Sequence, residues 1–244
     1  MASQPTPYYT PATFKFLRAL ARNNRRDWFL AHKGEYEATV KEPSLRLIAD
    51  MAAPLRAISP QLIADPKPVG GSLFRIYRDT RFASDKTPYK THIGISFFHA
   101  ATKATARGLA GNAAMGRLDA PVLYLHIEPG GCFTGGGIWH PQAPTLKRLR
   151  DFMIDNPRSW QRITTAKSFT KYFELGGERL SRPPRGYAHD HPLIEDLKRK
   201  DIVASAELTE AEVTGLGLRA ALLSRYRAMR PLTEWLCMGL EIDF

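Results

Sequence analysis

Hydrophobic residues over the first sixty positions recur at helical spacing. Thr10-Pro11 forms an N-cap and first-turn pair, and the apolar positions that follow predict a helix. A second helix is predicted after Asn23-Asn24, because this pair breaks the first helix and can cap the next. Pro43 can open a third helix, in which Pro54 is expected to kink or shorten the last turn.

The middle of the chain changes to a period of two. Apolar and polar residues alternate over Ile93–Phe97 and again over Leu123–Glu128, which is typical of strands with one buried face. Pro129-Gly130-Gly131 signals a turn, after which Cys132–Trp139 is predicted to return as a hairpin partner. Leu73–Tyr77 is predicted to be another strand.

Helical periodicity returns after His140-Pro141. Ile202–Leu208 is predicted to add a strand, and Leu216–Met238 a closing helical region that Pro231 interrupts. Helices, then strands, then helices indicate an α+β fold, with a central antiparallel sheet flanked by N-terminal and C-terminal helices.

Length and composition predict a single globular domain over residues 1–244. The chain is 43% hydrophobic, and no long polar linker divides it. Residues 1–10 are expected to be a flexible N-terminus. Residues 100–120, rich in Ala, Gly and Thr, are expected to be an exposed, mobile loop.

The chain is strongly basic. Lys and Arg outnumber Asp and Glu by 35 to 24, which gives a formal net charge of +11. A protein of this charge is suited to anionic partners such as nucleic acid, nucleotides or phosphorylated metabolites. The alternative is that the excess charge only aids solubility.

The two cysteines, Cys132 and Cys237, form no C-x-x-C pair. This spacing excludes a disulfide framework and a Cys-rich zinc site, and it suits a reducing cytoplasm. The N-terminus has no signal-peptide pattern, and no apolar stretch approaches the ~20 residues of a membrane span. The expected location is therefore the cytoplasm, with no membrane partner.

The stretch Leu73–Gly94 combines opposite charges and aromatic side chains at high density. Guanidinium and ammonium groups bind phosphate and carboxylate, and only Asp79 and Asp85 oppose the five cations of this stretch. We therefore expect a basic, aromatic-lined cleft for a phosphate-bearing ligand. The candidate ligand-binding residues are Arg75, Arg78, Arg81, Lys86, Tyr89 and Lys90, together with Arg185 from a later loop.

An internal network of ion pairs that fixes a loop against the sheet is the alternative for this stretch. Its aromatic side chains are open to two interpretations as well. Tyr77 and Tyr89 can stack on a base or sugar, or pack beneath the loop, whereas Phe82 is expected to pack in the core.

A second candidate site combines histidine with glutamate. His126 and Glu128 share one face of a predicted strand, His140 ends the partner strand, and His92 belongs to another strand. Two or three of these side chains can meet as a metal site or as an acid–base pair. The alternative is an ordinary hydrogen-bonded histidine on a half-polar sheet face. If the protein is an enzyme, the available proton-transfer groups are Asp79, Asp85, His126 and Glu128.

Several well-known catalytic motifs are absent from the sequence. It contains no Walker A or dinucleotide-binding glycine loop in a strand-to-helix setting, although Gly135-Gly136-Gly137 allows a bulge or a close approach of ligand to backbone. It also has no serine elbow and no H-E-x-x-H helix, which disfavours hydrolases of those kinds.

Five motifs together carry a resemblance to a known family. They are Asn23–Phe29 (NNRRDWF), Phe74–Phe82 (FRIYRDTRF), Asp85–Thr91 (DKTPYKT), Tyr124–Pro141 (YLHIEPGGCFTGGGIWHP) and Arg182–Tyr187 (RPPRGY). The chain resembles, over nearly its whole length, the uncharacterised bacterial and fungal proteins grouped as domain of unknown function family 2461. This resemblance implies no established activity, substrate or catalytic residue.

Three functions therefore follow from residue chemistry. The leading hypothesis is binding of a phosphate-bearing ligand in the basic cleft. The second is a non-catalytic nucleic-acid-binding module, which requires basic residues over a broad face, including the arginines of Leu216–Met238. The third is a metal-dependent enzyme at His126, Glu128 and His140. The sequence identifies no cofactor and no oligomeric state.

Overall fold

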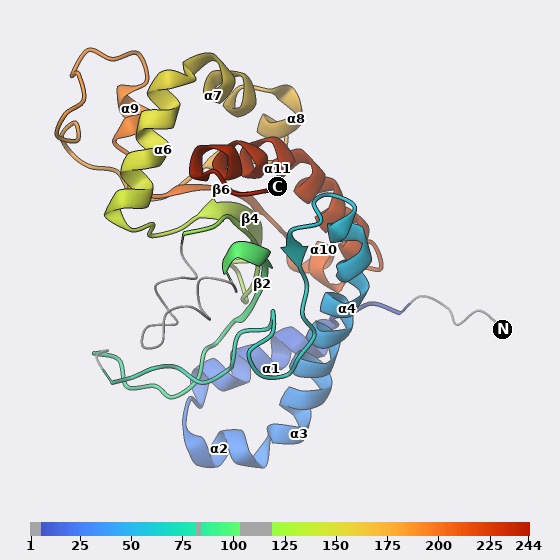
Figure 1. The fold of residues 1–244 in the computed structure, drawn as a ribbon. Helices are drawn as coiled ribbons and strands as arrows, with labels where there is room; N and C mark the ends of the chain where they lie inside the picture. Colours follow the sequence, from blue (N-terminus) through green and yellow to red (C-terminus); the bar gives the residue numbers. More distant parts are fainter. Residues whose placement is uncertain (1–5, 82–83, 103–118) are drawn as a thin grey trace.

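A six-stranded antiparallel sheet lies at the centre of the computed structural model, which describes residues 6–81, 84–102 and 119–244 (Figure 1). The strands follow the order β1-β2-β3-β4-β6-β5. They are β1 (Leu62–Ile63), β2 (Ile93–His99), β3 (Val122–Ile127), β4 (Phe133–Ile138), β5 (Glu174–Leu175) and β6 (Ile202–Glu207). The α+β fold is confirmed, as are the two alternating strands and the hairpin formed by β3 and β4.

One group of helices precedes β1, and a second group follows β4, interrupted by the strands β5 and β6. The N-terminal group is α1 (Pro11–Arg22), α2 (Arg26–Ala31), α3 (Lys33–Tyr36), the π-helical turn η1 (Glu37–Lys41) and α4 (Glu42–Arg56). The C-terminal group is α6 (Ala143–Asp155), α7 (Pro157–Thr164), α8 (Lys167–Thr170), α9 (Ile194–Leu197), α10 (Glu210–Thr214) and α11 (Leu218–Leu240). None of the helices in the described part of the chain combines the length and the hydrophobicity that a membrane-spanning segment needs.

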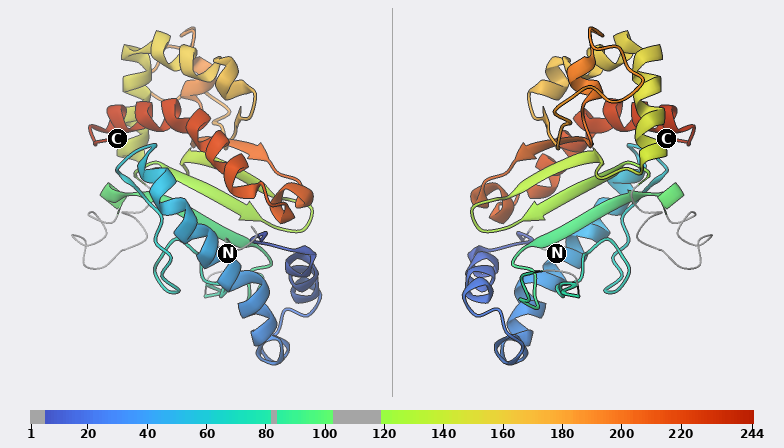
Figure 2. Two further views of the ribbon diagram at one scale, coloured as in Figure 1. Left: turned by 90° about the vertical axis from the view of Figure 1, so that its right-hand side faces the viewer. Right: turned by 90° about the vertical axis from the view of Figure 1, so that its left-hand side faces the viewer.

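One face of the sheet is covered by α11 and α4, which lie in front of the strands in the left view of Figure 2. The alternating positions Leu123, Leu125 and Ile127 of β3 are at most 1% exposed and belong to this core. Tyr226 of α11 reaches the sheet, where the Thr134 hydroxyl donates to its phenol oxygen at 3.0 Å. The intervening positions of β3 must point to the opposite face, because side chains alternate along a strand.

Leu73–Tyr77 does not form the predicted strand. It makes only isolated bridges, Leu73 with Ile95 and Tyr77 with Tyr89. The reason is that its backbone is shared between two partners. The Phe74 amide donates to β2, whereas the next bonds run to residues 88–90 of the same segment. Neither partner offers enough consecutive bonds for a ladder.

The predicted interruption at Pro231 is wrong, because α11 continues through this residue to Leu240. Pro231 and Arg227, four residues before it, are both exposed. The ring and the carbonyl that loses its hydrogen bond therefore face solvent, where the cost of a proline in a helix is smallest. Helix α4 ends two residues after Pro54, in agreement with the expected short last turn.

Two predicted mobile segments are only partly described. Of residues 1–10, the first five lie outside the described residues, whereas Tyr9 is 0% exposed and its hydroxyl lies 2.9 Å from that of Ser44. Of residues 100–120, positions 103–118 lie outside the described residues, and so does Phe82.

Candidate functional site

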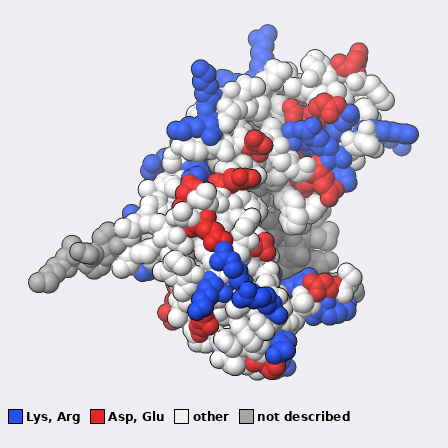
Figure 3. Space-filling view, turned by 180° about the vertical axis from the view of Figure 1, so that it is seen from behind, with Lys and Arg blue, Asp and Glu red and all other residues white. Residues whose placement is uncertain are grey.

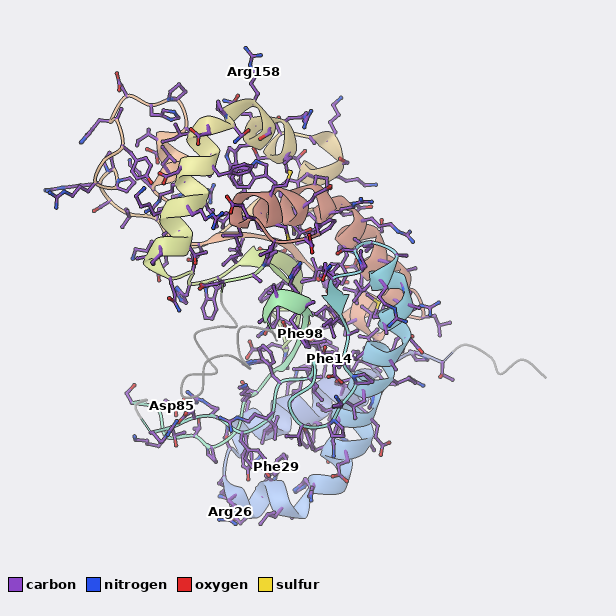
Figure 4. The ribbon with its side chains drawn as sticks, viewed as in Figure 1. Phe14, Arg26, Phe29, Asp85, Phe98 and Arg158 are labelled. Atoms are coloured by element: carbon purple, nitrogen blue, oxygen red, sulfur yellow. The ribbon has the colours of Figure 1, made fainter. Side chains whose placement is uncertain are left out.

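Asn24 connects the N-terminal helices to Leu73–Gly94, which we call the charged segment. Its side-chain amide donates to the Tyr89 carbonyl at 2.8 Å and accepts from the Tyr89 amide at 3.0 Å, as a neighbouring strand residue would. Phe29 of α2 stacks on the Tyr89 ring with 4.1 Å between centroids, and Figure 4 shows Phe29 pointing from α2 toward this segment. Tyr89 is only 3% exposed, and its ring packs beneath the segment.

Two ion pairs of the predicted internal network are present. Arg78 pairs with Asp85, at the tip of the loop in Figure 4, and also donates to the Thr87 hydroxyl. The hydrogen bond from Arg78 lowers the pKa of Asp85 to about 2. Arg81 pairs with Asp79 through two contacts of 2.7 and 3.0 Å, and this hydrogen bonding lowers the pKa of Asp79 to about 2. Both carboxylates are therefore ionised at neutral pH and cannot donate a proton.

The remaining cations of the segment differ in their surroundings. Lys86 is exposed and donates to the Thr80 carbonyl at 2.9 Å. Lys90 is half-buried, with its Nζ 5.2 Å from the centroid of the Phe74 ring. Burial, with a smaller contribution from Arg75, lowers the pKa of Lys90. Within the described residues, neither Lys90 nor Arg75 has a carboxylate partner.

A cavity of about 380 Å³ opens beside Lys90. We refer to it as the Lys90 pocket. It is lined by Ala21, Asn24, Arg78, Asp85, Thr87, Tyr89, Lys90, Thr91 and His92. Four of the eight predicted ligand-binding or catalytic residues of the segment line it, namely Arg78, Asp85, Tyr89 and Lys90. Arg75, Asp79, Arg81 and Lys86 do not.

The structure does not bring Arg185 to this pocket. Arg185 lies in the loop before α9, which packs beside α6 through a 2.8 Å hydrogen bond from Tyr187 to Asp151. Figure 1 shows this loop at the upper left, at the opposite end of the molecule from the segment before β2.

The histidine–glutamate cluster forms at the ends of β2 and β3. Candidate ligand atoms of His92, His126 and Glu128 all lie within 4.8 Å of one another. The His126 Nε2 is 3.1 Å from Glu128 Oε2, and the rings of His92 and His126 are 4.5 Å apart. All three side chains are partly buried. Burial is the main cause that lowers the pKa of His92.

Neighbouring groups hold this cluster in place. The Tyr124 hydroxyl lies 3.2 Å from His126 Nδ1, and the Thr91 hydroxyl donates to Glu128 Oε1 at 3.2 Å. Phe133 of β4 stacks on the His126 ring, with 4.8 Å between centroids. Because His92 and Thr91 also line the Lys90 pocket, the cluster and the pocket are contiguous.

His140, which the sequence places with His126 and Glu128, is not part of this cluster. The register pairs His126 with Phe133, at the start of β4, whereas His140 follows the end of β4. In an antiparallel hairpin these positions lie at opposite ends of the strands. His140 contacts Asp201 instead, which accepts its backbone amide at 2.6 Å and lies 3.4 Å from its ring.

Sequence reasoning missed three groups that shape the site: Asn24, Thr91 and Tyr124. Tyr124 shares the alternation that placed His126 and Glu128 on one strand face, so the signal was present in the pattern. The role of Asn24 depends on a contact across 65 positions, which no local pattern reveals.

The comparison with family models gives one match, to the family described as "Conserved hypothetical protein (DUF2461)", over residues 12–235. The chain is a DUF2461 protein. The match extends from α1 into α11 and therefore includes every described residue of the Lys90 pocket and of the histidine–glutamate cluster. No curated protein and no solved structure matches this DUF2461 chain.

Proposed function

We propose that the protein binds a phosphate-bearing ligand in the Lys90 pocket. The observation that carries this proposal is the half-buried ammonium of Lys90, which has no carboxylate partner among the described residues. Desolvating a charge is costly unless an opposite charge compensates it. An anion bound beside Lys90 supplies that compensation.

Other lining groups suit the same ligand. Arg78, which also lines the pocket, offers a guanidinium to phosphate oxygens. Asp85 is paired with Arg78. This ion pair offsets part of the negative charge of Asp85 and so reduces its repulsion of an anionic ligand. A volume of about 380 Å³ falls within the range of small-molecule sites, roughly 300–1,000 Å³. The ligand class is therefore a small phosphorylated metabolite or a mononucleotide.

The distribution of the other charges favours a small ligand over nucleic acid. Two arginines of α11 are paired with carboxylates, Arg225 with Glu212 at 2.7 Å and Arg230 with Glu234 at 3.8 Å. Figure 3 shows positive and negative side chains side by side over much of one face. A broad and uninterrupted basic surface, which non-specific nucleic-acid binding requires, is not supported by these contacts.

The test is a thermal-shift panel of inorganic phosphate, pyrophosphate, sugar phosphates, mononucleotides and oligonucleotides at two salt concentrations. A ligand at a hundred times its Kd adds about 2.7 kcal/mol to the free energy of unfolding, which raises Tm measurably. The variant Lys90→Met should lose this shift. Lys86→Met is the matched control, because Lys86 belongs to the same segment but does not line the pocket.

Two outcomes would overturn the proposal. One is that no phosphate-bearing compound stabilises the wild-type protein. The other is that Lys90→Met and Lys86→Met lose the shift equally, since this would indicate general charge attraction. Stabilisation by oligonucleotides alone, with a steep dependence on salt, would favour the nucleic-acid function instead.

We place this function in the cytoplasm. The support is that Cys132 and Cys237 are both buried free thiols, as expected in a reducing compartment.

A further inference from the structure

We propose that His92, His126 and Glu128 bind one divalent transition-metal ion. Nothing in the family description assigns a metal to this chain. The inference rests on the geometry of the three side chains and their neighbours, and it is independent of the anion that we propose for the Lys90 pocket.

The separation of the ligand atoms fits a single ion. Two nitrogen or oxygen ligands at about 2.1 Å from one ion lie about 3.0–3.4 Å apart in octahedral or tetrahedral geometry. The 3.1 Å between His126 Nε2 and Glu128 Oε2 already has this value. A nitrogen of His92 lies within 4.8 Å of both atoms, so a rotation of its side chain brings it into range.

The backbone of the sheet sets this arrangement. His126 and Glu128 are two residues apart in and just after β3, so they point to the same side of the sheet. Ile93 of β2 pairs with Ile127 of β3, which places His92, one residue before, opposite Glu128. The third ligand therefore faces the other two across the strand ladder.

In His126 and Glu128, the side-chain atom that would not bind the ion is hydrogen-bonded to a neighbouring group, as is common around metal sites. Histidine ligands usually bond through their second ring nitrogen to a neighbouring group, and ligating carboxylates are also hydrogen-bonded. Here Tyr124 contacts His126 Nδ1, and Thr91 donates to Glu128 Oε1, each at 3.2 Å. These contacts leave His126 Nε2 and Glu128 Oε2, which are 3.1 Å apart, as the atoms available to an ion. A hydrogen bond between His126 and Glu128 alone would explain the position of these two side chains, but it would not explain why His92 lies next to both of them.

The donor set selects the class of ion. Two imidazoles and one carboxylate suit Zn²⁺, Fe²⁺, Co²⁺ or Mn²⁺, whereas Ca²⁺ and Mg²⁺ prefer oxygen ligands alone. Three protein ligands leave at least one coordination position for water or substrate. Since His92 also lines the Lys90 pocket, the proposed ion would lie next to the pocket.

The experiment titrates chelator-treated protein with Co²⁺ in a phosphate-free buffer, followed by visible absorption of the bound ion. Bound metal is also counted after dialysis against Zn²⁺. We expect one ion per chain. We expect Glu128→Gln and His126→Ala to weaken binding by at least about 100-fold, since removing an outer partner alone costs about 10–100-fold. Tyr124→Phe should fall in that smaller range.

His140→Ala is the matched control, because it removes an imidazole near the sheet but outside the cluster. Its affinity for Co²⁺ should equal that of the wild type. Far-UV circular dichroism establishes that each variant is folded, and Glu128→Gln preserves the shape of the side chain. The proposal is overturned if the wild type binds no stoichiometric ion, or if folded Glu128→Gln binds Co²⁺ as tightly as the wild type. Neither result bears on phosphate binding, which uses a different probe.

Discussion

Replacing Asn24 with alanine removes both hydrogen bonds that tie the charged segment to the N-terminal helices. The backbone N–H and C=O of Tyr89 then have no other described partner. Each lost hydrogen bond costs about 1 kcal/mol, and a buried polar group left unsatisfied costs about 1–3 kcal/mol. We therefore expect Asn24→Ala to lower the free energy of unfolding by about 2–4 kcal/mol, which lowers Tm by about 5–15 °C in a chain of this size.

The assay is urea denaturation followed by circular dichroism, with Asn23→Ala as the matched control. The Asn23 side chain makes one local hydrogen bond, to the Ala19 carbonyl at 2.9 Å, at the end of α1. Its removal should cost about 1 kcal/mol or less. Asn24→Asp is a second probe, because it keeps the acceptor but loses the donor to Tyr89. If Asn24→Ala is no less stable than Asn23→Ala, the side-chain bridge contributes little and our account of the pocket wall is wrong.

Three further predictions concern other parts of the chain. Gly137→Ala should lose about 3 kcal/mol or more in urea denaturation, because φ is +126° and the new Cβ would lie 2.1 Å from a carbonyl oxygen of β6. Gly186→Ala, with φ +89° but open space around it, should lose only about 1–2 kcal/mol, and equal losses would contradict the steric argument. Burial lowers the pKa of Lys90, so the folded chain binds this proton less tightly than the unfolded chain and gains stability as the pH rises toward 10.5. Lys90→Met should therefore be more stable than the wild type at pH 7, whereas a loss of stability would refute this. A backbone hydrogen bond at the start of α10 lowers the pKa of Glu212, so its stabilising effect is present above pH 4.5 and is lost as the pH falls through the lowered value. The difference in stability between Glu212→Gln and the wild type should be clear at pH 7 and shrink in acid, and a difference independent of pH would show that the charge is irrelevant.

The order of elements could be predicted from the sequence because burial imposes a period on the chain. Strand β3 is the clearest case, since Leu123, Leu125 and Ile127 are buried and the residues between them are not. Leu73–Tyr77 shows where the same reasoning stops. It has the composition of a strand, but whether it forms one depends on which distant backbone groups accept its hydrogen bonds.

The candidate site could be predicted only in part, for a similar reason. Alternation placed His126 and Glu128 together, but the choice between His92 and His140 as the third residue depends on strand register. The charged segment was recognised as a whole, yet its sequence does not distinguish Lys90 from Lys86. Only the fold buries one beside Phe74 and leaves the other in solvent.

His126 projects from the paired backbone of β2 and β3, and His92 and Glu128 adjoin the end of this ladder, so the backbone positions of all three ligands are largely set before any ion arrives. A site of this kind accommodates little change in bond length. Larger ions such as Ca²⁺, with contacts of about 2.3–2.6 Å and a need for six or more oxygens, are poorly matched to it. Discrimination among metals would then be a property of the hydrogen-bonded ladder between β2 and β3, and a mutation that shifts these strands would change which ion is accepted without altering a single ligand.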